Sequence, residues 1–207
     1  MLAPSDPETE RRRRSVAVAG HRGDAATARA GLSDPAPQVR AVALGALERL
    51  GSLPDADLAA ALADPHLDVR RRAAEISAGH PSVDLLGALA DDDPRVVEIA
   101  AWACGEHESR RDAVVERLVE LATTSDVALV RESAIAALGA IGDPRGLDAI
   151  VAGTRDKPAV RRRAVLALAP FVDHDERAAE VAEAIARALE DRDWQVRQSA
   201  EDLDRAL

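Results

Sequence analysis

A valine followed four residues later by an alanine recurs six times along the chain. Each valine stands seven to ten residues after a leucine or isoleucine. The pairs are Val39 and Ala43, Val69 and Ala73, Val96 and Ala100, Val130 and Ala134, Val160 and Ala164, and Val196 and Ala200. Neighbouring valines are 27 to 36 residues apart, by subtraction of their numbers. Self-similarity at this period predicts a solenoid in which each unit packs only on its neighbours.

Aspartate, proline and glycine separate the apolar stretches. Proline is disfavoured inside a helix but tolerated in its first turn, so Asp64–Pro65 ends one helix and helps to start the next. Gly51 and Gly142 stand where a helix would end. These signals predict first helices near 24–33, 55–63, 82–91, 110–123, 144–154 and 174–190, with partners near 36–50, 66–78, 94–105, 127–141, 158–170 and 193–206.

The expected fold is all-α, a right-handed α-solenoid of about six helix pairs. Hydrophobic residues make up 47% of the chain and aromatic residues 1%, so small aliphatic side chains must form the core between helices. We expect one domain over residues 1–207, with polar residues such as Glu201 and Asp202 covering its last helix. An N-terminal capping helix at 7–20 precedes repeats near 24–50, 54–78, 81–105, 109–141, 143–170 and 173–207.

The net charge of −10 opposes binding of a polyanion over the whole surface. Cys104, the single cysteine, lies in an apolar run and is expected to be a buried thiol. The apolar run after Arg14 is broken by His21, Arg22 and Asp24, too early for a secretory signal, and no stretch is long enough for a membrane span. We therefore expect a cytoplasmic protein, a monomer or a weak oligomer.

Aspartate and Val-Arg pairs at these spacings, as in Asp64 to Val69–Arg70, resemble HEAT repeats. The subtype with the most similar period is the short repeat first associated with phycobilin lyases. In this class, an aspartate and the arginine after the valine commonly tie adjacent repeats together. The resemblance implies a structural ladder made of Asp34, Arg40, Asp64, Arg70, Arg131, Arg161, Asp191 and Arg197. Val97 replaces the arginine in the third unit, and Thr123 and Ala152 replace the aspartate in units four and five.

The second helices of HEAT arrays conventionally line the concave face. Positions two and six after each valine point outward if the valine faces the core. These positions predict a partner-binding surface made of Arg71, Glu75, Glu98, Trp102, Glu132 and Arg162. Tryptophan is enriched among the residues that dominate binding energy. The alternative interpretations are that Trp102 packs between repeats and that the glutamates form a solvated face.

Catalytic and metal-binding patterns do not emerge from the sequence. His80 and His107 occupy equivalent positions in neighbouring units, where capping of helix carbonyls is the simplest interpretation. HEAT-like deoxyhypusine hydroxylases hold iron through His-Glu pairs just after Val-Arg, and those positions contain no histidine here. No metal or other cofactor is expected.

The sequence thus favours a non-catalytic scaffold or adaptor that binds a peptide or helix of another protein in its concave groove. A basic segment of this partner would pair with Glu75, Glu98 and Glu132. A nucleic-acid-binding or DNA-glycosylase-like protein is the alternative, with Arg70–Arg72, Arg161–Arg163 and Arg11–Arg14 as phosphate contacts. Against it, aromatic residues for stacking are nearly absent, and Glu98 and Glu132 would repel the backbone. A phycobilin-lyase-like accessory protein is a second alternative.

Overall fold

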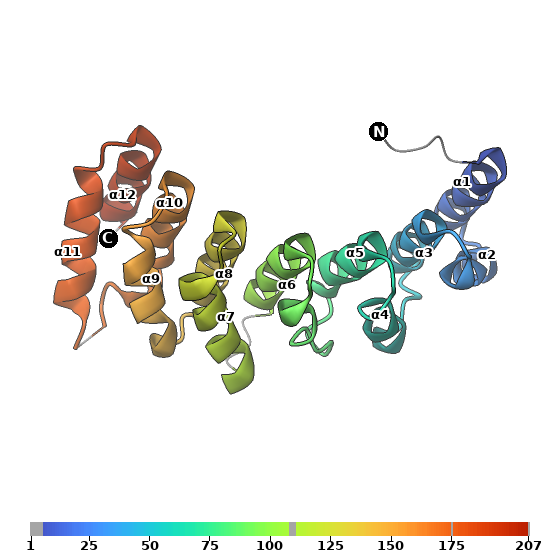
Figure 1. Ribbon diagram of the computed structural model, residues 1–207, viewed down its shortest axis with the longest axis horizontal. Helices are drawn as coiled ribbons and strands as arrows, with labels where there is room; N and C mark the ends of the chain where they lie inside the picture. Colours follow the sequence, from blue (N-terminus) through green and yellow to red (C-terminus); the bar gives the residue numbers. More distant parts are fainter. Residues whose placement is uncertain (1–5, 108–110, 175, 207) are drawn as a thin grey trace. The chain divides into compact units, whose positions relative to one another are not determined.

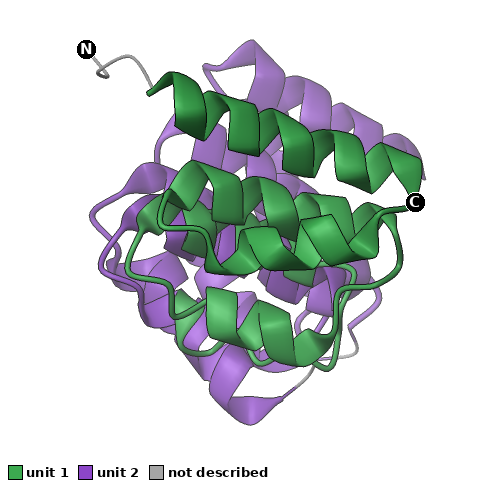
Figure 2. Cartoon of the chain, turned by 90° about the vertical axis from the view of Figure 1, so that its right-hand side faces the viewer, with its two compact units in different colours: residues 1–88 green, residues 89–207 purple. Residues whose placement is uncertain are grey.

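The computed structural model describes residues 6–107, 111–174 and 176–206. All regular structure within these ranges is helical. The chain divides into two compact units, residues 1–88 (unit 1) and residues 89–207 (unit 2), shown in different colours in Figure 2. Residues 109, 110, 175 and 207 of the predicted repeats lie outside the described residues. The all-α, α-solenoid prediction is confirmed, and each unit is a stack of helices (Figure 1).

Unit 1 contains two helix pairs and the predicted N-terminal helix. Its elements are α1 (Pro7–Arg22), α2 (Ala25–Ala30) with the 3-10 turn Gly31–Ser33, α3 (Pro37–Arg49), α4 (Asp55–Ala61) and α5 (Leu67–Ser77). The second helix α3 packs against both α1 and α5, while α2 packs on α1 and α3, and α4 packs on α5. Helix α1 therefore covers the side of α3 that faces away from α5.

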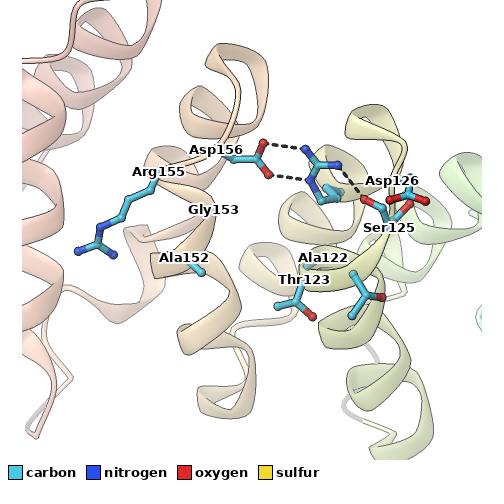
Figure 3. A pocket seen from close by; sticks show the side chains of 10 residues that line it. Ala122, Thr123, Ser125, Asp126, Ala152, Gly153, Arg155 and Asp156 are labelled. Atoms are coloured by element: carbon cyan, nitrogen blue, oxygen red, sulfur yellow. Dashed lines mark hydrogen bonds and ion pairs between the residues drawn. The ribbon is translucent and has the colours of Figure 1, made fainter.

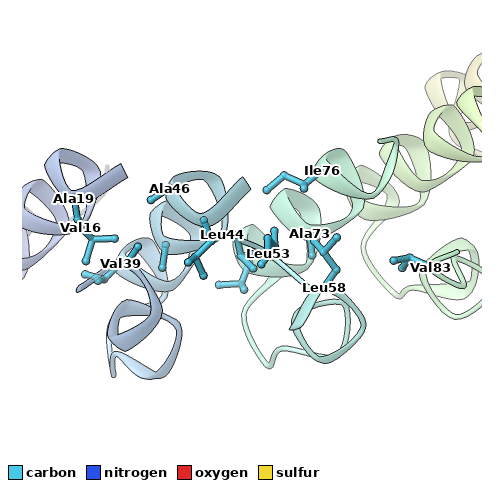
Figure 4. Close-up of a cluster of buried hydrophobic side chains, with 14 residues drawn as sticks. Val16, Ala19, Val39, Leu44, Ala46, Leu53, Leu58, Ala73, Ile76 and Val83 are labelled. Carbon is cyan, nitrogen blue, oxygen red and sulfur yellow. The ribbon is translucent and has the colours of Figure 1, made fainter. Parts of the chain in front are cut away.

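The core of unit 1 lies between these stacked helices (Figure 4). Val39 and Ala73, from the repeated valine and alanine positions, are fully buried, as is Leu58 from the first helix α4. Val16 of α1 joins the same cluster. Burial of such aliphatic side chains contributes roughly 1.5–3 kcal/mol for each large one, so the repeated apolar positions hold the stack together.

Unit 2 contains three complete pairs preceded by one second helix. Its helices are α6 (Pro94–Glu106), α7 (Asp112–Thr124), α8 (Ala128–Ile141), α9 (Leu147–Gly153), α10 (Pro158–Ala167), α11 (Ala178–Leu189) and α12 (Trp194–Ala206). The 3-10 turns Pro144–Gly146 and Ala169–Phe171 extend the fifth pair. The second helices pack in the order α6, α8, α10, α12, and each first helix packs on its own partner. Cys104 is buried, in agreement with the sequence.

Glycine allows consecutive second helices to approach closely. A Cβ atom added to Gly139 of α8 would lie 2.7 Å from the Cα atom of Ala167 in α10. Gly105 was expected to end its helix, but it lies inside α6, where an added Cβ would be 3.0 Å from Cα of Ala137 in α8. Gly142, by contrast, does end α8, with a φ of +63° that favours glycine.

The predicted first helix at 82–91 is wrong. The segment forms turns and ends in the single 3-10 turn Ala88–Ala90. The side chain of Asp84 accepts a hydrogen bond from the backbone nitrogen of Leu86, a local contact that competes with helix formation. Gly87 and the following Asp-Asp-Asp-Pro leave too few residues for a helix. Val83, Leu85 and Leu89 are buried nevertheless, so the segment still fills the space of a first helix.

None of the described helices is both long enough and apolar enough to cross a lipid bilayer.

Candidate functional site

The six residues of the predicted partner-binding surface are divided between the units. Arg71 and Glu75 lie on α5 in unit 1. Glu98 and Trp102 lie on α6, Glu132 on α8 and Arg162 on α10, all in unit 2. Each unit has its own cavity on its second helices. A single groove that joins all six residues stays a prediction.

The unit 2 cavity lies on the outer faces of α6, α8 and α10 and has a volume of about 440 Å³. Glu98, Trp102, Leu129, Glu132 and Arg163 line it, together with small residues of α8. Trp102 is 40% exposed and Leu129 is 52% exposed. We call this surface the unit 2 groove. Large apolar side chains thus face solvent beside three carboxylates, those of Glu98, Glu132 and Glu106, an arrangement that suits an amphipathic ligand.

A hydrogen bond and ion pairs position two of the three carboxylates of the unit 2 groove. The hydroxyl of Ser133 donates to Glu98 across the α6–α8 contact, at 3.2 Å. Glu132 lies 3.9 Å from the guanidinium of Arg162 and 3.8 Å from that of Arg163, distances at the outer limit of an ion pair. Because these contacts are long, Glu132 keeps part of its capacity to accept hydrogen bonds from a cationic ligand.

The unit 1 cavity has a volume of about 420 Å³ and lies on the outer faces of α1, α3 and α5. Three arginines, Arg49, Arg71 and Arg72, line it with His21 and Asp68, and its other lining residues include Ala17, Ala41 and Gly45. We call this surface the unit 1 groove. Glu75, predicted to contact a partner, pairs with Arg72 of its own helix at 2.8 Å.

Arginines after the repeated valines clamp neighbouring loops together. Nε and Nη2 of Arg40 donate to the two carboxylate oxygens of Asp64, both at 2.7 Å. Arg161 forms the same bidentate pair, here called a fork, with the two carboxylate oxygens of Asp191, at 2.8 and 2.7 Å. In each case Nη1 donates to a backbone carbonyl of the preceding loop, that of Asp34 or Asp156. One guanidinium therefore fixes two successive loops.

The remaining predicted ladder residues make related contacts. Arg70 donates to the carbonyl of Asp64 at 2.9 Å, and Arg197 donates to that of Asp191 at 2.6 Å. Asp34 accepts a fork from Arg12 of α1, with Nε at 2.8 Å. Arg12 is thus a further member of the ladder, not predicted from the sequence.

Asp156 is a second residue that the sequence analysis missed (Figure 3). Arg131 donates to both of its carboxylate oxygens, at 2.6 and 2.7 Å, and to the carbonyl of Ser125 at 2.7 Å. Asp156 stands four residues before Val160, whereas the predicted ladder aspartates stand five residues before their valines. A search for an aspartate near this distance from the valine would have found it. Arg155 points away from this pair. The surrounding cavity, about 450 Å³, thus has a structural ion pair on its wall.

The forks lower the pKa of the clamped aspartates. The hydrogen bond from Arg12 is the main cause for Asp34, that from Arg131 for Asp156, and that from Arg161 for Asp191. A carboxylate with a lowered folded pKa stabilises the fold above its ordinary pKa, and this contribution is lost as the pH falls through the folded pKa.

His80 bridges two carboxylates and does not cap helix carbonyls through its ring. Its Nδ1 lies 2.7 Å from Asp55 at the start of α4, and its Nε2 lies 2.9 Å from Glu48 of α3. Burial opposes the charged form, but hydrogen bonds to Glu48 and Asp55 outweigh it and raise the pKa of His80. Since both ring nitrogens face acceptors, the imidazolium form satisfies the site. His80 is therefore an ionic tie between two helices.

Within the described ranges, no group of three or more His, Cys, Asp or Glu side chains could hold a metal ion.

The comparisons with known proteins agree with this architecture. Residues 83–169 match the family of HEAT repeats. No curated protein matches the sequence. A designed armadillo repeat protein in complex with the peptide (KR)4 is similar in structure, with 18% identity, a TM-score of 0.65, and coverage of 86% of this chain and 96% of that chain. A second designed armadillo repeat protein has 18% identity, a TM-score of 0.63, and coverage of 84% and 95%.

The stacked helix pairs, the HEAT match and the structural likenesses together support a HEAT-type repeat protein.

Proposed function

We propose that the chain is a non-catalytic scaffold that binds a peptide or helix of a partner protein, with the unit 2 groove as the docking surface. Trp102 is the apolar contact, and Glu98 and Glu132 pair with basic residues of the partner. The observation that carries this proposal is the exposure of Trp102 on a cavity lined by three carboxylates.

Burial of the exposed part of Trp102 would supply a large share of the binding energy. Aromatic side chains provide large contact area at a small cost in conformational entropy, and a few such residues dominate most interfaces. Leu129 extends the apolar area from the neighbouring helix α8. A ligand that spans α6 and α8 can therefore cover both side chains.

The charge of the groove favours a basic ligand. Three glutamates line it (Glu98, Glu106 and Glu132), against one arginine, Arg163. The similar designed armadillo repeat protein is in complex with (KR)4, a peptide of basic residues. A groove with an excess of carboxylates on the same type of fold is suited to a ligand of that charge.

Nucleic acid binding has less support. Arg161 is a candidate phosphate contact, but it is only 7% exposed and its guanidinium is engaged by Asp191 and by a loop carbonyl. Arg70 also donates to a loop carbonyl. The arginine runs therefore serve partly as structural ties, and fewer guanidinium groups remain for phosphates.

Selection from a random 12-residue peptide library against the full chain tests the proposal. Peptides that combine tryptophan, phenylalanine or leucine with arginine or lysine should be enriched. Counter-selection against a Trp102→Ala variant should remove them, whereas counter-selection against Trp194→Ala should not. Trp194 is a matched control because it is 65% exposed and does not line the groove. Enriched peptides that are acidic, or that survive both counter-selections equally, would refute the proposal.

A further inference from the structure

We infer that the unit 1 groove is a second docking surface, specific for an acidic peptide segment of a partner protein. This surface does not contain Trp102 or any other residue of the unit 2 groove. The inference therefore stands on observations of unit 1 alone.

The charge of the unit 1 groove is opposite to that of the whole chain. Its lining includes the guanidinium groups of Arg49, Arg71 and Arg72 but a single carboxylate, that of Asp68. The chain as a whole has a net charge of −10. A concave surface with a local excess of positive charge attracts anionic groups and raises their association rate.

Two of these arginines have no carboxylate partner within the part of the chain that the structure describes. Arg49 and Arg71 are exposed, and no ion pair or hydrogen bond engages their side chains. Many other arginines, such as Arg40 and Arg161, lie within 4 Å of a carboxylate. Guanidinium groups pair with carboxylates in a bidentate geometry. Arg49 and Arg71 therefore retain their capacity to bind an external carboxylate.

The absence of a side chain at Gly45 leaves space for the guanidinium of the third arginine, Arg72. A Cβ atom added to Gly45 would lie 2.7 Å from Nη2 of Arg72. The missing side chain lets the guanidinium of Arg72 lie directly against α3, while Glu75 holds its other side at 2.8 Å. The cavity thus has a preorganised cation on its wall, and a fixed cation costs a ligand less ordering entropy than a mobile one.

The lining chemistry favours an acidic peptide over a nucleic acid. None of the residues that line this cavity is aromatic, so bases would have no stacking surface. A peptide can instead present glutamate or aspartate side chains at separate points, and backbone amides between them.

Fluorescence anisotropy with a fluorescein-labelled octaglutamate peptide tests the inference on the full chain at low ionic strength. We expect saturable binding that weakens at least tenfold in an Arg49→Ala, Arg71→Ala double variant. An Arg155→Ala, Arg192→Ala variant makes the same change in net charge in unit 2 and should weaken binding less than twofold. Equal weakening by the two double variants would show that net charge alone attracts the peptide, and would overturn the inference.

Two further measurements separate this site from the alternatives. Gly45→Leu fills the groove without a change in charge. The three atoms nearest to a Cβ added there all belong to the flexible end of Arg72, so the variant should fold and bind the peptide at least fivefold more weakly. Trp102→Ala should leave octaglutamate binding unchanged, whatever the outcome for the unit 2 groove. Tighter binding of octathymidylate than of octaglutamate, sensitive to Arg49 and Arg71, would assign the surface to nucleic acid instead.

Discussion

The two units share one architecture but present opposite chemistry on their second helices. In unit 1, the groove on α1, α3 and α5 has three arginines and no large exposed apolar side chain in its lining. In unit 2, the groove on α6, α8 and α10 has exposed Trp102 and Leu129 and three glutamates. Position two after the valine is Arg71 on α5 of unit 1, whereas it is Glu98 on α6 and Glu132 on α8 of unit 2.

The difference shows that the inward and outward positions obey separate constraints. The valine and alanine positions are buried in both units, as Val39 and Val130 illustrate. Arg–Asp clamps also recur in both, at Arg40 and Arg161. Outward positions are free of these packing constraints, so they can differ in charge and size between repeats without a change of fold.

The largest effect is expected from the clamps that the two units share. Arg40→Met in unit 1 and Arg161→Met in unit 2 each leave a partly buried aspartate without its cation, and each should lower the free energy of unfolding by about 3 kcal/mol. Urea denaturation followed by circular dichroism measures this loss. Arg205→Met is the control, because its pair with Asp202 is exposed and should contribute less than about 1 kcal/mol. A negligible loss of stability in only one of the two variants would show that the units do not share this stabilising clamp.

A smaller effect is expected in both units where neighbouring helices approach each other through glycine. Gly20→Val in unit 1 would place a Cβ atom 2.8 Å from Cβ of Ala46, and Gly139→Val in unit 2 would place one 2.6 Å from Cβ of Ala167. Each should destabilise its unit by about 2 kcal/mol, because the helices must separate. Thermal unfolding followed by circular dichroism measures the loss. In the same assay Gly87→Ala, whose added Cβ meets no atom within 4 Å, should be nearly neutral.

The smallest effect is a pH dependence located in unit 1. The raised pKa of His80 means that its tie to Glu48 and Asp55 is fully present below the ordinary histidine pKa and is lost as the pH rises through the folded pKa. Hydrogen exchange of α3 and α4, corrected for intrinsic rates, should show about 1 kcal/mol less protection at pH 8.5 than at pH 5.5. Helices α8 and α10 contain no histidine and should not change. His80→Gln should abolish the difference, and persistence of the difference in that variant would assign it to other groups.

Much of the fold could be predicted because the inward pattern is periodic. The valines, such as Val69 and Val96, placed every second helix to within a few residues. The first helix expected at 82–91 failed because Asp84 and Gly87 favour turns, while burial of Leu85 and Leu89 preserves the apolar pattern of a helix. Asp156 was missed because the aspartate was expected two residues after Ile150, at Ala152, whereas Val160 follows Ile150 by ten residues and Val69 follows Leu62 by only seven.

The candidate site was less predictable because outward positions have no repeating constraint. Helical periodicity placed Trp102 on an outward face, but only the structure shows its 40% exposure. It also shows that Leu129 and Arg163, neither of which was predicted for the partner-binding surface, line the same cavity. The separate basic surface of unit 1 includes Arg49, which no repeated sequence position identifies.

Titration calorimetry with a peptide selected on the full chain tests most directly whether the unit 2 groove is the docking surface. Trp102→Ala should weaken binding by about 2 kcal/mol, as for other aromatic residues at the centre of an interface, with an unchanged circular dichroism spectrum. Trp194→Ala removes a side chain of the same size and should change the affinity by less than about 0.5 kcal/mol. An undiminished affinity in a folded Trp102→Ala protein, or an equal loss in both variants, would contradict the account.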